Sequence, residues 1–286
     1  MRRITVTMIG AGNLGKTLGR LLVNHQLATI LGVVNRSIDS AEKSVQWIGD
    51  GCAFADIASL PPANLILITT PDDALVDTCL RLQKNPHLLP GSVVVHCSGS
   101  LTSDVLWPMK ALGCLVASIH PMRSFADPTL SVTAFPGTFC AYEGDLDAIN
   151  LIAPLFQALG AVTFPIEADK KSLYHAAGVF ASNYLVTLSH QALSCLTRAG
   201  VGSDMAMKII VDLMRGTLLN LEQTQSPAHA LTGPIQRGDL ATIRNHLTAF
   251  EDPHQKDLYT ALGKATLALT SHDKKTILAL CEALTQ

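Results

Sequence analysis

Four polar residues interrupt or precede a segment, 173–188, that is otherwise almost wholly apolar: Lys171, His175, Ser182 and Asn183. A helix that is apolar nearly all round is expected to be buried. A buried polar group must be hydrogen-bonded or functional, because an unpaired one costs about 1–3 kcal/mol. At about 100° per residue, Lys171 and Ser182 project within about 20° of each other, so the four residues form one broad polar face.

These residue types suit the reduction of a carbonyl or an imine. Hydride transfer needs a proton donor beside the reacting group and a neutral amide to orient that group. We expect His175 to donate the proton, with Lys171 as the alternative donor, while Asn183 orients the substrate and Ser182 contacts it. A structural hydrogen-bond network at a domain interface would use the same residues, and the sequence leaves that possibility open.

Further polar residues follow apolar runs where strands are expected to end. In an open α/β sheet, ligands bind outside the carboxyl ends of the strands. This rule selects Thr70 and Pro71 for the cofactor path, Ser98 for the nicotinamide end, and Ser100 and His120 for contact with the substrate, with His120 also a candidate catalytic group.

Simpler roles exist for some of these positions. We expect His96 to be a core histidine with both ring nitrogens satisfied, and Ser98 and Ser100 are also possible helix caps. Arg237 lies in a Gly- and Pro-rich loop and is a candidate for gripping a substrate carboxylate, although Asp239 or solvent is the commoner partner of a loop arginine. Asp239 is expected to cap the helix that follows.

The elements that must position these groups begin with a glycine-rich turn. The apolar run 4–9 leads into a helical pattern through Gly10, Ala11, Gly12, Asn13, Leu14 and Gly15. A strand that turns through Gly-x-Gly-x-x-Gly into a helix predicts a dinucleotide site, in which the pyrophosphate lies on the free N–H groups of the helix. The alternative is an ordinary glycine-rich turn.

The end of the second apolar run indicates which dinucleotide is bound. NAD sites usually place Asp or Glu there for the ribose 2′-hydroxyl, whereas an Arg accommodates a 2′-phosphate. This chain has Asn35-Arg36-Ser37 and no carboxylate before Asp39. A guanidinium and a hydroxyl suit a phosphate, so we expect NADP(H). A solvated Arg36 and a Ser37 that only caps the next helix would be the alternative.

The periodicity of the chain changes about halfway along. Near-continuous apolar runs alternate with helical patterns up to about residue 168, with runs at 65–70, 92–96 and 115–120 and weaker ones near 137–142 and 161–166. This pattern predicts an α/β Rossmann domain with a doubly wound parallel sheet over 1–168. Only helical patterns follow, beginning with one over 169–199, so we expect an all-α substrate and dimerisation domain over 169–286.

Composition excludes several classes of protein. A formal charge of −2 gives no basic footprint for nucleic acid or for an anionic membrane. No apolar segment is long enough to span a bilayer. The seven cysteines form no C-x-x-C pair and no regular spacing, so they indicate buried thiols in a reducing compartment, with no metal site. We expect a soluble cytoplasmic protein.

Several motifs resemble those of a known group of proteins. The fingerprint and Asn35-Arg36-Ser37 resemble the 6-phosphogluconate-dehydrogenase-like superfamily, which includes pyrroline-5-carboxylate reductase. Nearly the whole chain looks like the Rossmann-like proteins that carry the domain of unknown function 2520. That closer resemblance rests on His96-Cys97-Ser98-Gly99-Ser100, Ile119-His120-Pro121, Tyr174-His175-Ala176-Ala177, Ser182-Asn183-Tyr184 and Leu231-Thr232-Gly233-Pro234. Some members of this family are regarded as an alternative type of ketopantoate reductase, and the superfamily implies a homodimer.

The chain departs from two enzymes of the superfamily at informative positions. Standard ketopantoate reductases carry Lys, Asn and Asn at steps of four on one helix, where this chain has His175, Val179 and Asn183. The His-Pro-Met element of prephenate dehydrogenase resembles His120-Pro121-Met122, but the segment that precedes it differs.

We therefore expect an NADPH-dependent reductase of a small 2-oxo acid, with ketopantoate in pantothenate synthesis as the first candidate. Catalysis would take place in the cleft between the two domains. The alternatives are a non-catalytic NADP(H) sensor or scaffold, and a reductase or dehydrogenase of another small substrate resembling pyrroline-5-carboxylate or prephenate.

Overall fold

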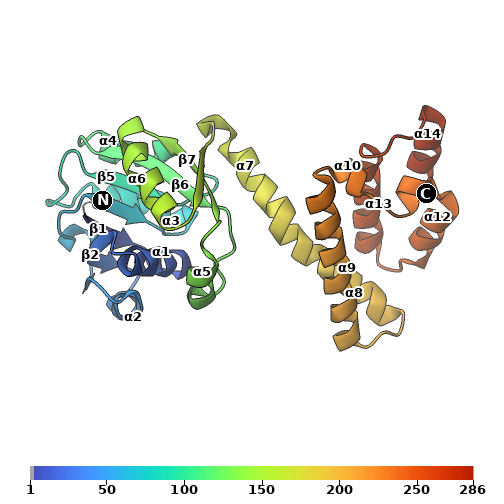
Figure 1. Cartoon of the computed structure of the whole chain (residues 1–286), viewed down its shortest axis with the longest axis horizontal. Coiled ribbons are helices and arrows are strands. Elements are labelled where there is room, and N and C mark those ends of the chain that lie inside the picture. Colours follow the sequence, from blue (N-terminus) through green and yellow to red (C-terminus); the bar gives the residue numbers. More distant parts are fainter. Residues whose placement is uncertain (1–2, 286) are drawn as a thin grey trace. The chain divides into compact units, whose positions relative to one another are not determined.

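The computed structural model describes residues 3–285 of the chain. The chain divides into two compact units, Met1–Asn183 and Tyr184–Gln286, which are blue to yellow-green and yellow to red in Figure 1. The division lies later than the boundary after residue 168 that the sequence predicts. The segment between the two positions belongs to the first unit because its helix is bonded to the sheet there, through Lys171 and Tyr174.

An eight-stranded sheet forms the centre of the first unit, in the order β3-β2-β1-β4-β5-β6-β7-β8. The strands are β1 (Ile4–Ile9), β2 (Ala28–Val34), β3 (Cys52–Phe54), β4 (Leu65–Ile68), β5 (Val93–His96), β6 (Leu115–Pro121), β7 (Phe139–Gly144) and β8 (Val162–Pro165). The first six strands have the strand order of a dinucleotide-binding fold, with its reversal between β1 and β4. The predicted Rossmann sheet is confirmed.

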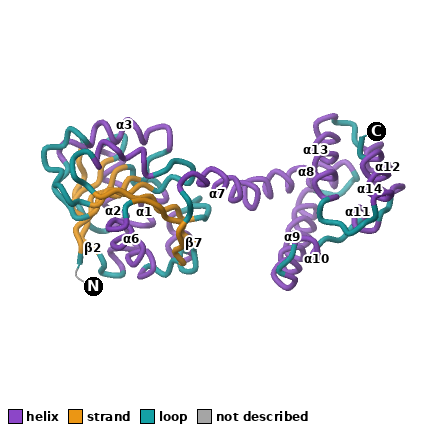
Figure 2. The backbone as a smooth tube through the Cα atoms, turned by 90° about the horizontal axis from the view of Figure 1, so that it is seen from above, coloured by secondary structure: helices purple, strands orange, loops and turns teal. Residues whose placement is uncertain are grey.

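Two hydrophobic clusters lie on opposite faces of this sheet. Leu65 and Leu67 of β4 belong to one, and Ile66 and Ile68 to the other. Figure 2 shows α3 on one face and α1, α2 and α6 on the other. The helices of this unit are α1 (Asn13–Asn24), α2 (Ile38–Ile48), α3 (Asp72–Leu82), α4 (Trp107–Lys110), α5 (Pro128–Ala134), α6 (Leu146–Ala158) and α7 (Lys171–Gly178), with 3-10 turns η1 (Ile57–Ser59), η2 (Ser103–Leu106) and η3 (Ala168–Lys170).

The sheet differs from the expected all-parallel arrangement at one edge. β7 pairs antiparallel with β6, and β8 then pairs parallel with β7 through the crossover helix α6. An antiparallel neighbour needs no crossover over the sheet face, and only the short helix α5 separates β6 from β7. The register places Ser118 of β6 opposite Glu143 of β7.

The second unit contains only helices among its described residues, as predicted from the sequence. They are α8 (Tyr184–Arg198), α9 (Ser203–Thr224), α10 (Pro227–Ala230), α11 (Pro234–Arg237), α12 (Leu240–Ala249), α13 (Pro253–Leu267) and α14 (Lys274–Ala283). A small core joins α12 to α14 through Ile243, Leu247 and Leu280. No helix in the described part of the chain is long and apolar enough to cross a membrane.

Candidate functional site

The glycine-rich turn between β1 and α1 uses each glycine differently. Gly10 has a φ of +87°, and a Cβ there would lie 2.6 Å from the side chain of Thr70. A Cβ at Gly15 would lie 2.4 Å from the Thr69 hydroxyl oxygen, so this glycine lets α1 approach the sheet. Nothing lies within 4 Å of a Cβ built at Gly12. These are the three roles expected of a dinucleotide turn, with open space where the pyrophosphate would lie.

The N-terminus of α1 has free N–H groups that can bind an anion. The first helical hydrogen bond runs from the Lys16 N–H to the Gly12 carbonyl, at 2.8 Å. The N–H groups of Asn13 and Leu14 precede it and have no carbonyl partner within the helix. Together with the helix dipole they form an anion-binding terminus. The Asn13 side chain donates to the carbonyls of Phe125 and Ala126, at 2.9 Å each, and so ties this turn to the loop after β6.

The side chain of Asn35, which is predicted to contact the cofactor, is hydrogen-bonded to the glycine-rich turn and to α2. Its side-chain oxygen accepts the Ala11 N–H at 2.6 Å, and its amide donates to the Ser40 carbonyl and to the Ser44 hydroxyl, each at 2.9 Å. Ala11, also predicted as a contact, is 1% exposed. The polar groups that Asn35 would offer to a cofactor are therefore used inside the protein.

A cavity of about 800 Å³ opens over this turn. It is lined by residues from the ends of β1, β2 and β4 and from α3, among them Gly10, Ala11, Gly12, Asn13, Leu14, Asn35, Arg36, Ser37, Thr70, Pro71 and Arg81. The volume is within the range of small-molecule sites. The hydroxyl oxygen of Thr70 is buried and has no hydrogen-bond partner in the protein. That orphaned hydroxyl is what a ligand in the cavity would satisfy.

Two cationic side chains line the same cavity. Arg36 is exposed at the end of β2, beside Ser37, whose hydroxyl accepts the Ser40 N–H at 3.3 Å and so caps α2. The Ser37 hydroxyl proton is left to donate. Arg81 of α3 forms an exposed ion pair with Asp56 at 3.0 Å. The sequence did not single out Arg81, because no local pattern shows that the far end of α3 lines the same cavity as Arg36.

A second cluster of polar groups lies where β5 and β6 end, around Gly99. A Cβ at Gly99 would lie 2.3 Å from Nδ1 of His175 and 2.9 Å from Nε2 of His120. Only glycine allows both imidazoles to approach this loop. The two rings stand nearly perpendicular, with centroids 5.6 Å apart. The structure thus brings together two of the predicted catalytic residues, which are far apart in the sequence.

Tyr174 joins this cluster and was not predicted as a site residue. Its hydroxyl oxygen lies 3.1 Å from Nδ1 of His120 and 3.3 Å from the His120 carbonyl oxygen. Both contacts are satisfied when the Tyr174 hydroxyl donates to the His120 carbonyl and the His120 Nδ1–H donates to the Tyr174 hydroxyl. In this tautomer Nε2 of His120 is unprotonated, and its lone pair is directed toward Gly99. Burial, followed by the charges of His175 and Lys171, lowers the pKa of His120 to about 4. His120 is therefore neutral at pH 7.

His96 is a core histidine, as predicted from the sequence. It is fully buried. Its Nδ1 accepts the Ser98 N–H at 3.1 Å, so the proton is on Nε2, which donates to the Thr102 carbonyl at 3.0 Å. Burial, followed by the charge of Lys171, lowers its pKa to about 4. His96 shapes the loop that carries Gly99.

The serines of this loop have partners within the first unit. The Ser98 hydroxyl accepts the N–H groups of Ser100 and Leu101, at 3.2 and 2.9 Å, which stabilises a turn. The Ser100 hydroxyl donates to the carboxylate of Asp72 at 2.7 Å. Ser98, which the sequence placed beside the nicotinamide, has its oxygen turned into the loop. Asp72 is the exposed first residue of α3, and Ser100, in the loop after β5, is half-buried.

Lys171 does not have the surroundings of a proton donor. Its side chain is almost wholly buried, and its ammonium donates to the Glu143 carboxylate at 2.9 Å and to the Ser118 hydroxyl. Burial lowers its pKa, and the ion pair with Glu143 opposes that shift. These partners do not favour Lys171 as the proton donor, and its role as the alternative donor stays a prediction.

The helix that follows Lys171 is not one continuous α-helix, contrary to the expectation for 169–199. A π-helical turn, η4 (Val179–Asn183), separates α7 from α8. A π turn is wider than an α turn, so the alignment of Lys171 with Ser182 calculated at 100° per residue does not hold. Ser182 and Asn183 lie in this turn and are exposed. π turns occur frequently at functional sites.

Arg237 belongs to the second unit, where it ends α11. Asp239 caps α12 by accepting the Thr242 N–H at 3.0 Å, as predicted. The role of Arg237 as a substrate contact stays a prediction.

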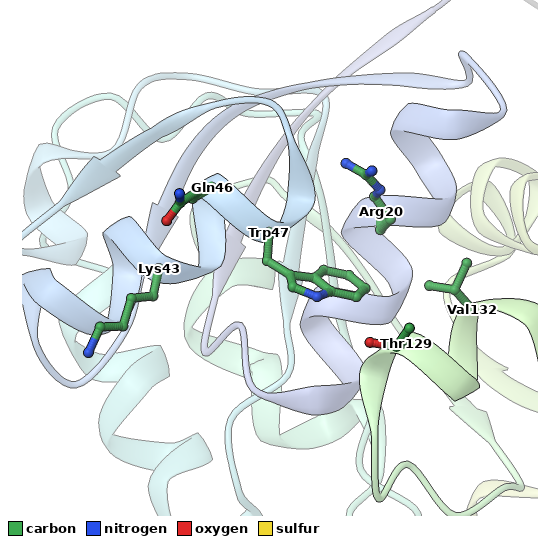
Figure 3. Close-up of a pocket in the computed structure, with 6 residues that line it drawn as sticks. All are labelled: Arg20, Lys43, Gln46, Trp47, Thr129 and Val132. Carbon is green, nitrogen blue, oxygen red and sulfur yellow. The ribbon is translucent and has the colours of Figure 1, made fainter.

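A separate cavity of about 520 Å³ lies between α1, α2 and α5 in the first unit. Figure 3 shows the Trp47 ring near Arg20, while the Lys43 amine extends away from them. Arg20 already donates to the Ile48 carbonyl at 3.0 Å. The polar groups of this cavity do not converge, so we assign it no ligand.

Two domain models match the sequence. Residues 1–121 match a Rossmann-like domain, and residues 138–266 match a domain of unknown function, DUF2520. No curated protein matches the sequence.

Solved structures with the same fold cover nearly the whole chain. A Bacteroides fragilis protein, BF3122, described as a candidate NADP oxidoreductase, has a TM-score of 0.77 at 21% identity, over 93% of this chain and 98% of its own. Protein TM1727 from Thermotoga maritima has a TM-score of 0.69 at 24% identity, over 98% and 100%. An imine reductase from Myxococcus stipitatus in complex with NADP+ has a TM-score of 0.67 at 15% identity, over 96% and 98%. At these identities the likeness establishes the fold.

Proposed function

We propose that this chain, a Rossmann-like domain followed by a DUF2520 domain, is an NADPH-dependent reductase of a small carbonyl or imine compound. The observation that carries the proposal is the cavity over the glycine-rich turn, where open space at Gly12, an unpartnered Thr70 hydroxyl and the Arg36 guanidinium lie along one surface. The imine reductase bound to NADP+ and the Bacteroides fragilis protein support it.

The protein offers suitable binding groups for both the pyrophosphate and the 2′-phosphate of NADPH. The N–H groups at the start of α1 would hold the pyrophosphate, and Arg36 with the Ser37 hydroxyl would hold a 2′-phosphate. The Thr70 hydroxyl would bond the cofactor between them. When bound, NADPH supplies the hydride. Asn35 and Ala11 would act indirectly by keeping the turn in shape.

His175 is the residue to which we assign the proton. It lies beside Gly99 and His120, in the half-buried surface at the ends of β5 and β6. His120 is neutral, and its Nε2 can accept a hydrogen bond. It is therefore better suited to accept a hydrogen bond from a substrate hydroxyl or from His175 than to donate the proton. We assign the orientation of the reacting group to Asn183 and retain Ser182 and Arg237 as substrate contacts. The cofactor-side role of Ser98 stays a prediction, because its hydroxyl can still donate a hydrogen bond while its oxygen accepts two N–H groups.

Ketopantoate is our first substrate candidate, because the chain resembles the alternative ketopantoate reductases in its motifs. A second candidate class is imines, and one observation favours it. The Asp72 carboxylate lies outward beside Ser100, and its charge acts on His120, His96 and Lys171. A carboxylate at the site would attract a protonated imine and repel the carboxylate of a 2-oxo acid.

Oxidation of NADPH in the presence of ketopantoate, other 2-oxo acids and cyclic imines tests the proposal. We expect turnover with at least one compound and a preference for NADPH over NADH. A protein that binds NADPH but oxidises it with none of these compounds would instead be an NADP(H) sensor or scaffold.

We also propose that the protein is a homodimer formed through the helical unit. The helix α8 is largely apolar yet has no buried residue in the single chain, and Val186 is 71% exposed. Large exposed apolar surfaces mark interaction sites.

A further inference from the structure

A row of polar side chains crosses three neighbouring strands inside the first unit. His96 of β5 is in register with Ser118 of β6, and Ser118 is in register with Glu143 of β7. Side chains at paired positions of adjacent strands point to the same face of a sheet. All three residues are less than a tenth exposed. The mechanism proposed above uses none of them.

Glu143 is the carboxylate in this row, and both of its oxygens accept hydrogen bonds. Its Oε1 accepts the Ser103 N–H at 2.8 Å and the Lys171 ammonium at 2.9 Å, and its Oε2 accepts the Ser103 hydroxyl at 2.6 Å. Lys171 also donates to Ser118. A buried ion pair needs such extra bonds to offset the loss of hydration. Its geometry is therefore tightly fixed.

The ion pair fixes the helix that carries the site. Lys171 is the first residue of α7, and Tyr174 and His175 follow it by three and four positions. Residues at these spacings lie on the same face of a helix. The bond from Lys171 to Glu143 therefore sets how the face with Tyr174 and His175 meets the ends of the strands.

We propose that Glu143 is a positioning residue of the reduction: through Lys171 it holds Tyr174 against His120 and His175 against Gly99. The expected effect on kcat rests on the proposed function. The expected effect on the positions of Tyr174 and His175 rests on the structure alone. A shift of about 1 Å in a reacting group can cost about 100-fold in rate. The ion pair thus has a task that a purely apolar contact between α7 and the sheet would not perform.

The Lys171 cation of this pair also acts on the charge state of His120. The charged or titratable groups that face His120 are His175, Lys171 and Tyr174 from α7, His96 from β5 and Asp72 from α3. The Lys171 cation disfavours a second positive charge nearby, so it contributes to the low pKa of His120, after burial and His175. Removing that cation should raise the pKa of His120 toward the ordinary value of a histidine.

The test compares the variant Glu143→Gln with the double variant Glu143→Gln/Lys171→Met. The single variant leaves a buried lysine unpaired and is expected to be unstable. The double variant removes both charges with side chains of similar shape, so it should fold with a melting temperature close to that of the wild type. We expect the kcat of the double variant to be about 100-fold below that of the wild type, while its affinity for NADPH stays within about twofold of the wild-type value.

A second readout needs no substrate. The ring nitrogens of His120, followed by NMR, should show a weakened hydrogen bond to Tyr174 in the double variant. The raised pKa that follows from loss of the Lys171 charge does not by itself test positioning. The matched control is Lys110→Met/Asp145→Asn, which removes an ion pair whose lysine is exposed, and it should change neither readout.

A double variant that regains both stability and kcat, with wild-type His120 signals, would overturn the proposal and leave the pair a structural one. If the wild type turns over no substrate, the proposed function fails. The NMR comparison still decides whether Glu143 positions the cluster.

Discussion

At the scale of single residues, two neighbours at the end of β2 have different tasks. Asn35 is turned inward and bonds Ala11, Ser40 and Ser44, whereas Arg36 is exposed at the cavity. We therefore propose that Asn35 supports the turn for any dinucleotide, whereas Arg36 discriminates between NADPH and NADH. The sequence indicated both as cofactor contacts because a motif records residue types and not the direction of a side chain.

Arg36→Ala should weaken NADPH binding by about 10- to 100-fold, because a charge-assisted hydrogen bond contributes about 1.5–3 kcal/mol. NADH binding should change by less than about threefold, since NADH has no 2′-phosphate. Titration of the nucleotide fluorescence measures both affinities, and Lys84→Ala, an exposed cation outside the cavity lining, serves as the control. Equal losses for both nucleotides would remove Arg36 from the 2′-phosphate site.

His96 and His120 should make the fold sensitive to acid. Their pKa values are about 4 in the folded protein, and an unfolded chain has about 6.5. Between these values the unfolded state binds protons that the folded state does not, so stability falls as the pH drops from about 6.5 to about 4, by roughly 3 kcal/mol for each histidine. Urea unfolding at several pH values measures this. His96→Gln should flatten the curve in this window, and an unchanged curve would contradict the assignment.

At the scale of elements, the glycine-rich turn shows what sequence can reveal. The roles of Gly10, Gly12 and Gly15 follow from backbone geometry that the motif itself specifies, and the structure has all three. The π turn at Val179–Asn183 and the ion pair of Lys171 with Glu143 were not predicted. The ion pair depends on an antiparallel register between β6 and β7, which no local pattern encodes.

Gly12→Ala and Gly15→Ala form a matched pair of substitutions one helical turn apart. Gly15→Ala should destabilise the protein by about 1–3 kcal/mol, because its Cβ would overlap the Thr69 hydroxyl. Gly12→Ala should cost less than about 1 kcal/mol, because its Cβ enters open space at the helix N-cap. It should nevertheless weaken NADPH binding at least about tenfold, since the proposed function places the pyrophosphate in that space. Thermal unfolding measures the loss of stability, and NADPH titration measures the loss of affinity. A larger loss of stability in Gly12→Ala than in Gly15→Ala, with unchanged NADPH affinity, would refute the roles assigned to the two glycines.

At the scale of the whole molecule, the sequence predicted an α/β unit followed by a helical one, and both are present. The division falls at Asn183, later than expected, because the polar face of α7 is bonded to the sheet and counts with the first unit. Hydrophobic periodicity marks where strands stop but not which helix packs on which core. The expectation that the apolar helix over 173–188 is buried is wrong for the single chain, in which Leu173, Phe180 and Val186 are each at least 70% exposed.

We expect the chain to sediment as a dimer at micromolar concentration. Val186→Glu should yield monomers, because a charge at an apolar interface is costly to bury. Sedimentation velocity distinguishes the two species, and Asp212→Ser, at an exposed polar position of α9, is the control. A wild-type monomer at that concentration would contradict the proposed dimer.

We propose that the cluster at Gly99 delivers a proton in an NADPH-dependent reduction. His175→Ala tests it most directly, with kcat and NADPH affinity measured side by side on the substrate that the wild type reduces fastest. Ser172→Ala, an exposed position on the same helix, is the control. We predict a fall in kcat of about 10²- to 10⁴-fold with NADPH affinity within about twofold of wild type. A kcat within a few-fold of wild type would contradict the account.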